Sequence, residues 1–220
     1  MIAAVHATPA SIAPLAAALA DELPGAQLWN IIDDRLGPDA DAVGGELTPE
    51  LRDRMLNLVR HGVTGGADAV VIACSMYGEV GRVTEKLFTT PVFTSDADMM
   101  ADIVRAAPRR IAVVASLQGA AVDTSSRLTA SLAAGRHSAA VVVPVFCEGA
   151  AQAAGRADIP ALVGALAAGL EGVGGSFDMV CIAQYSLSPA ADELAAKIAV
   201  PVVAPTRTAA RAIARSLGTS

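Results

Sequence analysis

Short apolar runs rich in β-branched residues alternate with longer stretches of helical periodicity along the whole chain. In the first half the apolar runs predict four strands, at Ile2–Ala7, Gln27–Ile32, Ala69–Cys74 and Pro91–Thr94. Helical spacing is found in the segments between them, at Pro9–Glu22, Thr48–Val63 and Asp96–Ala106. Strict alternation of strand and helix predicts parallel sheets that are built from right-handed crossover units.

The same series begins again in the second half of the chain. Predicted strands lie at Ile111–Ser116, Ala139–Val145, Met179–Ala183 and Pro201–Ala204. Predicted helices lie near Gln118–Ala134, Ile159–Val173, Pro189–Ile198 and Thr206–Leu217.

The two halves also match residue by residue. The run Asp68–Cys74 aligns with Asp178–Gln184 at an offset of 110 residues, and Pro91 aligns with Pro201 at the same offset. We interpret this as a duplication. The alternative is that any two strand–turn–helix units followed by a proline look alike. The first half is expected to span 1–96 and the second 97–205, and the C-terminal helix 206–220 could pack back on the first.

These observations predict an α/β fold with two pseudo-symmetric halves, each a four-stranded parallel sheet flanked by helices. Ligands of such open sheets bind in the crevice beyond the carboxyl ends of the strands. We therefore expect the active site in the cleft between the halves, among the loops that follow the strands.

Composition narrows the class of protein. Hydrophobic residues make up 53% of the chain and charged residues 17%, which excludes disorder. No uncharged apolar run reaches the roughly 18 residues of a membrane span, and the start lacks the basic residues of a secretory signal, so we expect a cytoplasmic protein without a membrane partner. The net charge is −6 and aromatic residues make up 3%, which argues against nucleic acid as a partner.

Three cysteines are present, and their spacing suggests neither a disulfide framework nor a metal site. Cys74 closes an apolar strand, and the helix predicted after it begins with unpaired amide groups that favour an anion. The same helix end would lower the pKa of the thiol, and the thiolate is the form that acts as a base or nucleophile. We therefore interpret Cys74 as functional rather than as an inert core cysteine, and Cys147 and Cys181 as structural.

His6 ends the first predicted strand. A neighbouring parallel strand that ends in Cys74 would bring imidazole and thiol within reach, so His6 could orient or deprotonate the thiol. The alternative is a histidine that caps the next helix or binds a backbone carbonyl. His61 and His137 fall in a helix end and a polar loop, where we expect them to face solvent.

The matching strand end of the second half carries an amide, a phenol and a hydroxyl, from Gln184, Tyr185 and Ser186. These groups can bind carboxylate or carbonyl oxygens but are poor bases near neutral pH. Ser188 and Pro189 have the pattern of an N-cap followed by proline at the first helical position. No glycine-rich phosphate motif follows a strand, so we expect no nucleotide cofactor.

The duplicated halves are flavodoxin-like, and their matching strand ends carry the strings Ala73-Cys74-Ser75 and Ala183-Gln184-Tyr185-Ser186. Together these features resemble the aspartate/glutamate/hydantoin racemase superfamily, which includes arylmalonate decarboxylase and maleate isomerase. In the racemases each half supplies one cysteine, from a motif such as A-C-N-T or G-C-T-H. One cysteine removes the proton of the substrate α-carbon, and the other returns it from the opposite face.

The resemblance implies that Cys74 is the first-half cysteine and that the loop of Ser75, Met76 and Tyr77 binds the substrate carboxylate. His6 stands roughly where glutamate racemases have an aspartate beside the cysteine.

The second half departs from the racemase pattern. Gln184 stands where the second cysteine is expected, and Ser186 stands where amino-acid racemases often have histidine. Arylmalonate decarboxylase also works with a single cysteine, but that cysteine lies in its second half. The chain therefore resembles an atypical member with a single active-site cysteine.

The leading hypothesis is a cofactor-independent racemase, epimerase or isomerase that acts at the α-carbon of a small carboxylate, with Cys74 as acid, base or nucleophile. The expected carboxylate ligands are Thr8, Ser75 and Ser116. Gln184, with Tyr185 or Ser186, would contact the other substrate oxygen or complete proton transfer. The alternatives are a decarboxylase of a malonate-like acid, a non-catalytic carboxylate-binding protein, and a thiol hydrolase with a Cys74–His6 pair. A homo-oligomer is compatible with the resemblance, since dimers are common in this superfamily.

Overall fold

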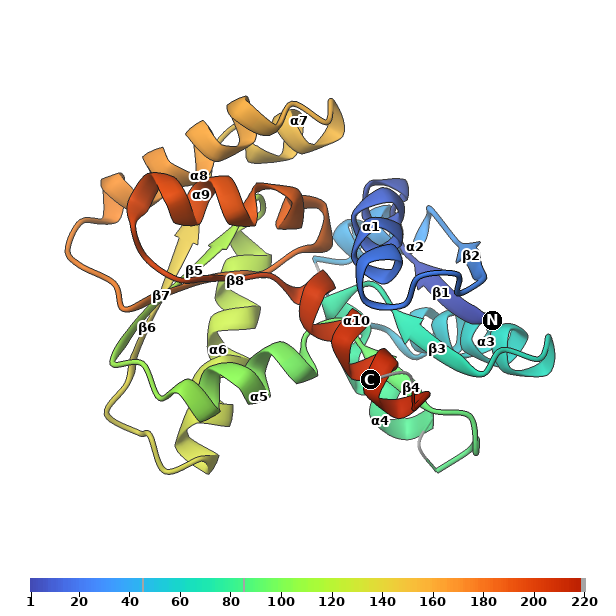
Figure 1. Cartoon of the computed structure of the whole chain (residues 1–220). Helices are drawn as coiled ribbons and strands as arrows, with labels where there is room; N and C mark the ends of the chain where they lie inside the picture. The colour runs from blue at the N-terminus through green and yellow to red at the C-terminus, as the bar shows by residue number, and fades with distance from the viewer. Residues whose placement is uncertain (45, 85, 219–220) are drawn as a thin grey trace. The chain divides into compact units, whose positions relative to one another are not determined.

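The computed structural model describes residues 1–44, 46–84 and 86–218. The chain divides into two compact units (Figure 1). The first consists of Met1–Ala97 together with the described residues from Thr206 onward, and the second is Asp98–Pro205. Each unit has its own four-stranded parallel sheet, which confirms the predicted α/β class.

The first unit is built on a sheet with the strand order β2-β1-β3-β4. Its two inner strands are buried along their whole length, as expected for parallel strands between two helical layers. The strands are β1 (Ile2–His6), β2 (Leu28–Ile32), β3 (Ala69–Ile72) and β4 (Val92–Thr94). The helical segments are η1 (Pro9–Ser11), α1 (Ile12–Glu22), α2 (Leu36–Ala42), α3 (Pro49–Thr64), η2 (Ser75–Tyr77), α4 (Gly78–Thr84) and α10 (Pro205–Ser216).

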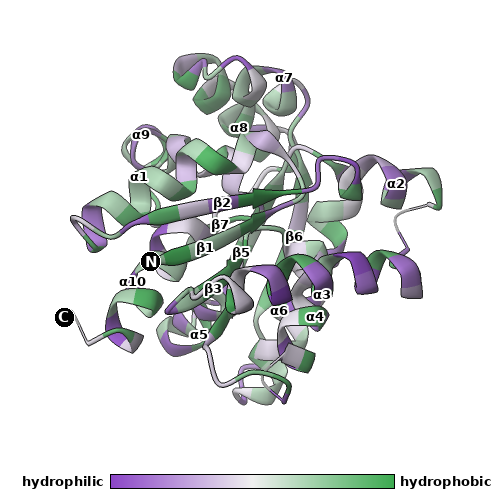
Figure 2. Cartoon of the chain, turned by 90° about the vertical axis from the view of Figure 1, so that its right-hand side faces the viewer, coloured by the Kyte–Doolittle hydropathy of each residue, from purple (hydrophilic) through white to green (hydrophobic). Residues whose placement is uncertain are grey.

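Helix α3 covers one face of this sheet. Its apolar side chains, Met55 and Val59 among them, pack on the β1 and β3 residues that point to that face, and Figure 2 shows the helix with alternating hydrophilic and hydrophobic stretches. A Cβ atom on Gly62 would lie 2.9 Å from the Cβ of Ala3, so the helix approaches the strand more closely than any larger residue would allow. The start of α3 is fixed by Thr48, whose hydroxyl accepts a hydrogen bond from the Leu51 N–H.

The last helix, α10, belongs to the first unit although the strand before it belongs to the second. Its apolar side, which includes Ala210 and Ile213, is buried. On its exposed side the Arg211 guanidinium donates to the Glu22 carboxylate at the end of α1, at 2.8 Å.

The second unit repeats the arrangement, with the strand order β6-β5-β7-β8. The strands are β5 (Arg110–Ala115), β6 (Val141–Phe146), β7 (Met179–Ile182) and β8 (Val202–Val203). The helical segments are α5 (Ala97–Ala106), α6 (Gln118–Ala134), α7 (Ala150–Gly155), α8 (Ile159–Val173), η3 (Tyr185–Ala190) and α9 (Ala191–Ile198). In Figure 1 α8 and α9 lie on one side of this sheet and α5 and α6 on the other.

The alternation of side chains along the strands supplies a core on each face of the second sheet. Ala112 and Val114 of β5 point into the core under α8 and α9, whereas Ile111 and Val113 point into the core under α5 and α6. This alternation explains why the sequence of the strand is a continuous apolar run.

The register of the strands repeats between the units. Ile2 pairs with Ala69 in the first unit, and Ile111 pairs with Met179 in the second, at positions 109 and 110 residues further along. The pairing of Val70 with Val92 recurs as that of Val180 with Val202. The offsets seen in the sequence are therefore offsets of equivalent positions in two sheets of the same topology.

The repeated aspartate has a structural role in the second unit. Both carboxylate bonds of Asp178 come from main-chain N–H groups, those of Arg109 and Arg110, at 2.8 and 2.9 Å. The Asp178 N–H in turn donates to the Arg110 carbonyl at 2.9 Å. The first unit repeats this last bond, from the Asp68 N–H to the Met1 carbonyl. Both aspartates thus fix the start of a central strand.

Within the described ranges, none of the helices has the length and apolar character that crossing a membrane requires.

Candidate functional site

The carboxyl edge of the first sheet carries Cys74, which Ala73 separates from the end of β3. Cys74 is half-buried, whereas Cys147 and Cys181 in the second unit are buried. The backbone at Cys74 is still extended, so side-chain alternation continues from the strand and places Cys74 on the face of the sheet that α3 covers. The following residues Ser75 and Met76 are also half-buried and form the turn η2.

His6 lies on the other face of that sheet. Val5 pairs with Ile72, and both belong to the core under α3, so the next residue His6 points to the opposite face from Cys74. The imidazole is fully buried, and its ring nitrogens bind Ser11 Oγ at 2.7 Å and Asn30 Oδ1 at 3.0 Å. These contacts are those of a histidine with a structural role, which was the alternative to a role in deprotonating the thiol. The partners are side chains rather than the backbone carbonyl that this alternative named.

Burial keeps the His6 ring neutral. Desolvation lowers the pKa of His6 and outweighs the opposing effect of the hydrogen bond to Asn30. Ser11 Oγ, which lies against Nδ1, donates its own proton to the main-chain oxygen of Thr8 at 2.9 Å, and the Asn30 amide lies against Nε2. Both nitrogens of His6 are therefore used inside the first unit.

Thr8 follows His6 and is exposed. Its hydroxyl accepts a hydrogen bond of 3.4 Å from the Ala10 N–H, which caps the short helix η1. This bond leaves the proton of the hydroxyl available for another acceptor.

Tyr77, expected in the carboxylate-binding loop, has a fully buried side chain. Its hydroxyl donates to the main-chain oxygen of Leu36 in α2 at 3.2 Å. Burial, with a smaller contribution from the nearby Cys74 charge, raises the pKa of Tyr77 to about 12. The Tyr77 phenol is therefore uncharged, and its hydrogen bond connects the loop after Cys74 to α2.

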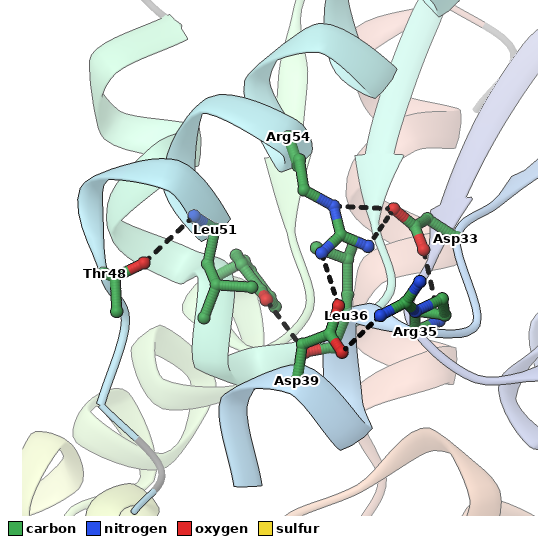
Figure 3. Close-up of polar contacts among 8 residues, drawn as sticks. Asp33, Arg35, Leu36, Asp39, Thr48, Leu51 and Arg54 are labelled. Atoms are coloured by element: carbon green, nitrogen blue, oxygen red, sulfur yellow. Dashed lines mark hydrogen bonds and ion pairs between the residues drawn. The ribbon is translucent and has the colours of Figure 1, made fainter. Parts of the chain in front are cut away.

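An arginine that sequence reasoning missed lies at the same edge of the first sheet (Figure 3). Arg54 of α3 donates through Nε and Nη2 to Asp33 Oδ2, at 3.0 and 2.6 Å, and through Nη1 to Asp39 Oδ2 at 2.6 Å. Asp33 directly follows β2, and Asp39 lies in α2. The only sequence signal was an arginine within a helix, and the fold alone brings it to a strand end.

The ion pairs of Arg54 with Asp33 and Asp39 hold α2 against α3. The Arg54 guanidinium, through its hydrogen bond, lowers the pKa of Asp39, and the two aspartates raise the pKa of Arg54. Arg35 also donates to Asp39, at 3.3 Å. Because two carboxylates already balance the guanidinium, Arg54 does not leave a net positive charge at this edge.

In the second unit, Ala183 separates Gln184 from the end of β7, and Ser116 directly follows β5. The Ser116 N–H and hydroxyl both donate to Gln184 Oε1, at 2.8 and 3.0 Å. Gln184 and Ser186 are half-buried, whereas Ser116 and Tyr185 are buried. Of the predicted residues in this unit, the structure thus brings Gln184 and Ser116 into contact.

The expectation that Ser188 caps a helix is wrong. Ser188 and Pro189 lie inside η3, and α9 begins only at Ala191. The reason is that the turn after β7 is wound as a 3-10 helix for six residues, so the proline falls within it. Among the described residues the buried Ser188 hydroxyl has no hydrogen-bond partner.

The two other cysteines are packed in the second unit. Burial raises the pKa of Cys147 to about 11, and Gly169 of α8 approaches its sulfur so closely that a Cβ there would lie 2.7 Å from it. Cys181 Sγ lies 3.7 Å from Met99 Sδ in the core under α5. Both cysteines therefore fill space in the cores. Among the described residues, no three His, Cys, Asp or Glu side chains are grouped so that they could hold a metal ion.

Solved structures with a similar fold include racemases and a decarboxylase. Allantoin racemase from Klebsiella pneumoniae is 18% identical with a TM-score of 0.67, over 100% of this chain and 89% of the other. A glutamate racemase from Bacillus anthracis is 13% identical with a TM-score of 0.75, over 100% and 83%. An arylmalonate decarboxylase is 19% identical with a TM-score of 0.62, over 97% and 91%.

No protein-family model matches the sequence, and no curated protein matches it by sequence. The structural likeness extends over nearly the whole chain and confirms the fold that the resemblance implied, with two four-stranded parallel sheets and their flanking helices.

Proposed function

We propose that the protein is a cofactor-independent enzyme of the racemase, epimerase or isomerase type that acts at the α-carbon of a small carboxylate. The observation that carries the proposal is the position of Cys74. All three cysteines lie in the described ranges, and Cys74 is the one that is not buried. It stands at the carboxyl edge of a parallel sheet, where ligands of such sheets bind, in a fold shared with racemases.

In the proposed reaction the Cys74 thiolate takes the proton of the α-carbon. The electron pair of the broken C–H bond moves into the carboxylate and gives an enediolate. Return of the thiol proton to the same face would restore the substrate, so inversion requires a proton from water on the opposite face of the planar carbon. The hydroxide that is left then takes the proton of the Cys74 thiol. Fixed hydrogen-bond donors lower the energy of the enediolate, and the Ser75 and Thr8 hydroxyls are accessible donors of the first unit.

His6 has a positioning role in this proposal. Its buried, neutral ring joins the end of β1 to Asn30 on β2 and to Ser11 at the start of α1. A ring whose two nitrogens are so bonded, on the face opposite to Cys74, is poorly suited to accept the thiol proton. These contacts also argue against the thiol hydrolase alternative.

Decarboxylation of a malonate-like acid is the second candidate function. It is favoured by Gln184, an amide rather than a thiol, at the strand end equivalent to that of Cys74. Loss of CO2 leaves the electron pair of the broken C–C bond in an enediolate, and a single proton from Cys74 then completes the product. The fold is also similar to that of arylmalonate decarboxylase.

Alkylation by iodoacetamide tests the proposed site. We expect Cys74 in the folded protein to alkylate much faster than the buried Cys147 and Cys181, with the modified peptides identified by mass spectrometry. Pools of amino acids, hydroxy acids and malonates are then screened for saturable protection of Cys74. Equal rates for the three thiols, or no protection by any pool, would contradict the proposal.

A further inference from the structure

The hydrogen bonds at Ser116 fix the orientation of the Gln184 amide. A main-chain N–H can only donate, so the Gln184 atom that lies 2.8 Å from the Ser116 nitrogen must be the amide oxygen. The Ser116 hydroxyl donates to the same oxygen at 3.0 Å. The usual ambiguity between amide oxygen and nitrogen is thereby removed at this residue.

In the Ser116–Gln184 pair, the group left for a ligand is consequently the NH2 group of Gln184, a hydrogen-bond donor. Within the described residues, both hydrogen bonds of the Gln184 side chain end on Oε1. The remaining group, Nε2, carries two N–H donors and accepts nothing. Ser116 is only 8% exposed, whereas Gln184 is half-buried, so a ligand would meet the amide rather than the hydroxyl.

In the first unit, the positions equivalent to Ser116 and Gln184 both hold a different residue. Ser116 is equivalent to Ala7, and Gln184 is equivalent to Cys74, at the offsets that relate the two sheets. The side chain of Ala7 can make no hydrogen bond. The Ser116 hydroxyl therefore occurs in the unit that carries the Gln184 amide. The unit that carries the Cys74 thiol has no hydroxyl at the equivalent position.

We infer that Ser116 is a positioning residue that holds Gln184 as a donor to a carboxylate oxygen of the ligand. In this arrangement Gln184 determines specificity for an oxygen acceptor and takes no proton. The assignment of a small carboxylate as the ligand rests on the proposed function. The role of Ser116 as a direct carboxylate ligand is replaced by an indirect one, through Gln184.

Side-chain amide signals in NMR spectra give a direct test. The chain has four Gln and two Asn residues, so protein labelled with ¹⁵N gives six side-chain NH2 pairs. The Gln184 pair is assigned by its loss in Gln184→Glu. Titration with sodium malonate, lactate or aspartate should shift this pair saturably for at least one of them. The pair of Gln118, an exposed residue of the same unit, should not move, and sodium chloride at equal ionic strength is the control.

Two variants separate orientation from packing. Gln184→Glu can still accept both bonds from Ser116, but it presents a carboxylate oxygen instead of a donor, and we expect carboxylate binding at least about tenfold weaker. Ser116→Ala removes one of the two bonds to Oε1, and we expect about three- to tenfold weaker binding. It should also move the Gln184 NH2 signals in the ligand-free protein. Ser126→Ala, at an exposed serine of the same unit, should change neither property.

The outcomes for this inference and for the proposed function are distinct. If a carboxylate protects Cys74 from alkylation but leaves the Gln184 signals unmoved, the inference fails and the proposed function stands. If the Gln184 signals respond but no reaction depends on Cys74, the inference stands and the proposed function fails. Unchanged Gln184 signals in ligand-free Ser116→Ala, or no response to any of the three carboxylates, would also overturn the inference.

Discussion

The buried hydroxyl of Tyr77 donates a hydrogen bond to the main-chain oxygen of Leu36 across 3.2 Å. Tyr77 lies three residues after Cys74, and Leu36 is the first residue of α2. The bond therefore connects the loop that follows Cys74 to a helix that the local sequence did not predict. The phenol, with its pKa raised to about 12 by burial, stays protonated throughout the neutral range.

Tyr77→Phe should lower the free energy of unfolding by about 1–2 kcal/mol, because the variant removes a buried hydrogen bond and leaves the Leu36 oxygen without this donor. Urea titration at neutral pH measures the change. A variant as stable as the wild type would show that water or another group replaces the phenol.

Arg54→Lys should loosen α2 although the charge is kept, because an ammonium group cannot reproduce the fork that contacts Asp33 and Asp39 together. We expect faster hydrogen exchange of the amides of residues 36–42, measured by mass spectrometry. Arg52→Lys is the matched control, since Arg52 lies on the same helix and pairs with exposed Glu79 instead. Equal increases in hydrogen exchange for the two substitutions would argue against a role of Arg54 in holding α2 in place.

His6 should make the protein less stable in mild acid. Burial lowers the pKa of His6 in the folded state, so the unfolded chain, with an ordinary pKa of about 6.5, binds a proton that the folded protein does not. The free energy of unfolding should therefore fall as the pH is lowered from 7.5 through 6.5 to 5.5. Urea titrations at these values should show a smaller fall for His6→Gln than for the wild type or His137→Gln. An unchanged pH dependence in His6→Gln would contradict this.

Gly62→Ala should destabilise the first unit by about 1–3 kcal/mol, because the new methyl group would meet the Cβ of Ala3 at 2.9 Å in a packed core. Gly164→Ala is the control. Gly164 lies exposed within α8 with no atom within 4 Å of the added Cβ, so that substitution should stabilise the protein by about 0.5–1 kcal/mol. Thermal unfolding of both variants decides the comparison.

Regular periodicity explains how much of the fold could be predicted. The predicted bounds Gln118–Ala134 and Ile159–Val173 agree with α6 and α8, because their helical spacing is continuous and a glycine follows each. Helix α2 was not predicted. Gly37 and Pro38 fall within its seven residues, and contacts from Tyr77 and Arg54 hold it in place.

For the candidate site, the sequence allowed us to predict the residues at the ends of strands but not their hydrogen-bond partners. Cys74 and Gln184 were recognised because each closes an apolar run. The partners of His6 depend on which face the last strand residue points to, and that follows from strand register rather than from local sequence. The bonds between Ser116 and Gln184 likewise join residues 68 positions apart.

Exchange of the substrate α-proton in D2O, followed by proton NMR, is the decisive test of Cys74 as the group that reacts at the α-carbon. The carboxylates that protect Cys74 are incubated with the wild type, with Cys74→Ser, and with Cys147→Ala as a control at a buried thiol. We expect loss of the α-proton signal, or formation of a decarboxylated product, with the wild type and Cys147→Ala but not with Cys74→Ser. Exchange at the wild-type rate in Cys74→Ser, or no reaction of any protecting carboxylate with the wild type, would contradict this role of Cys74.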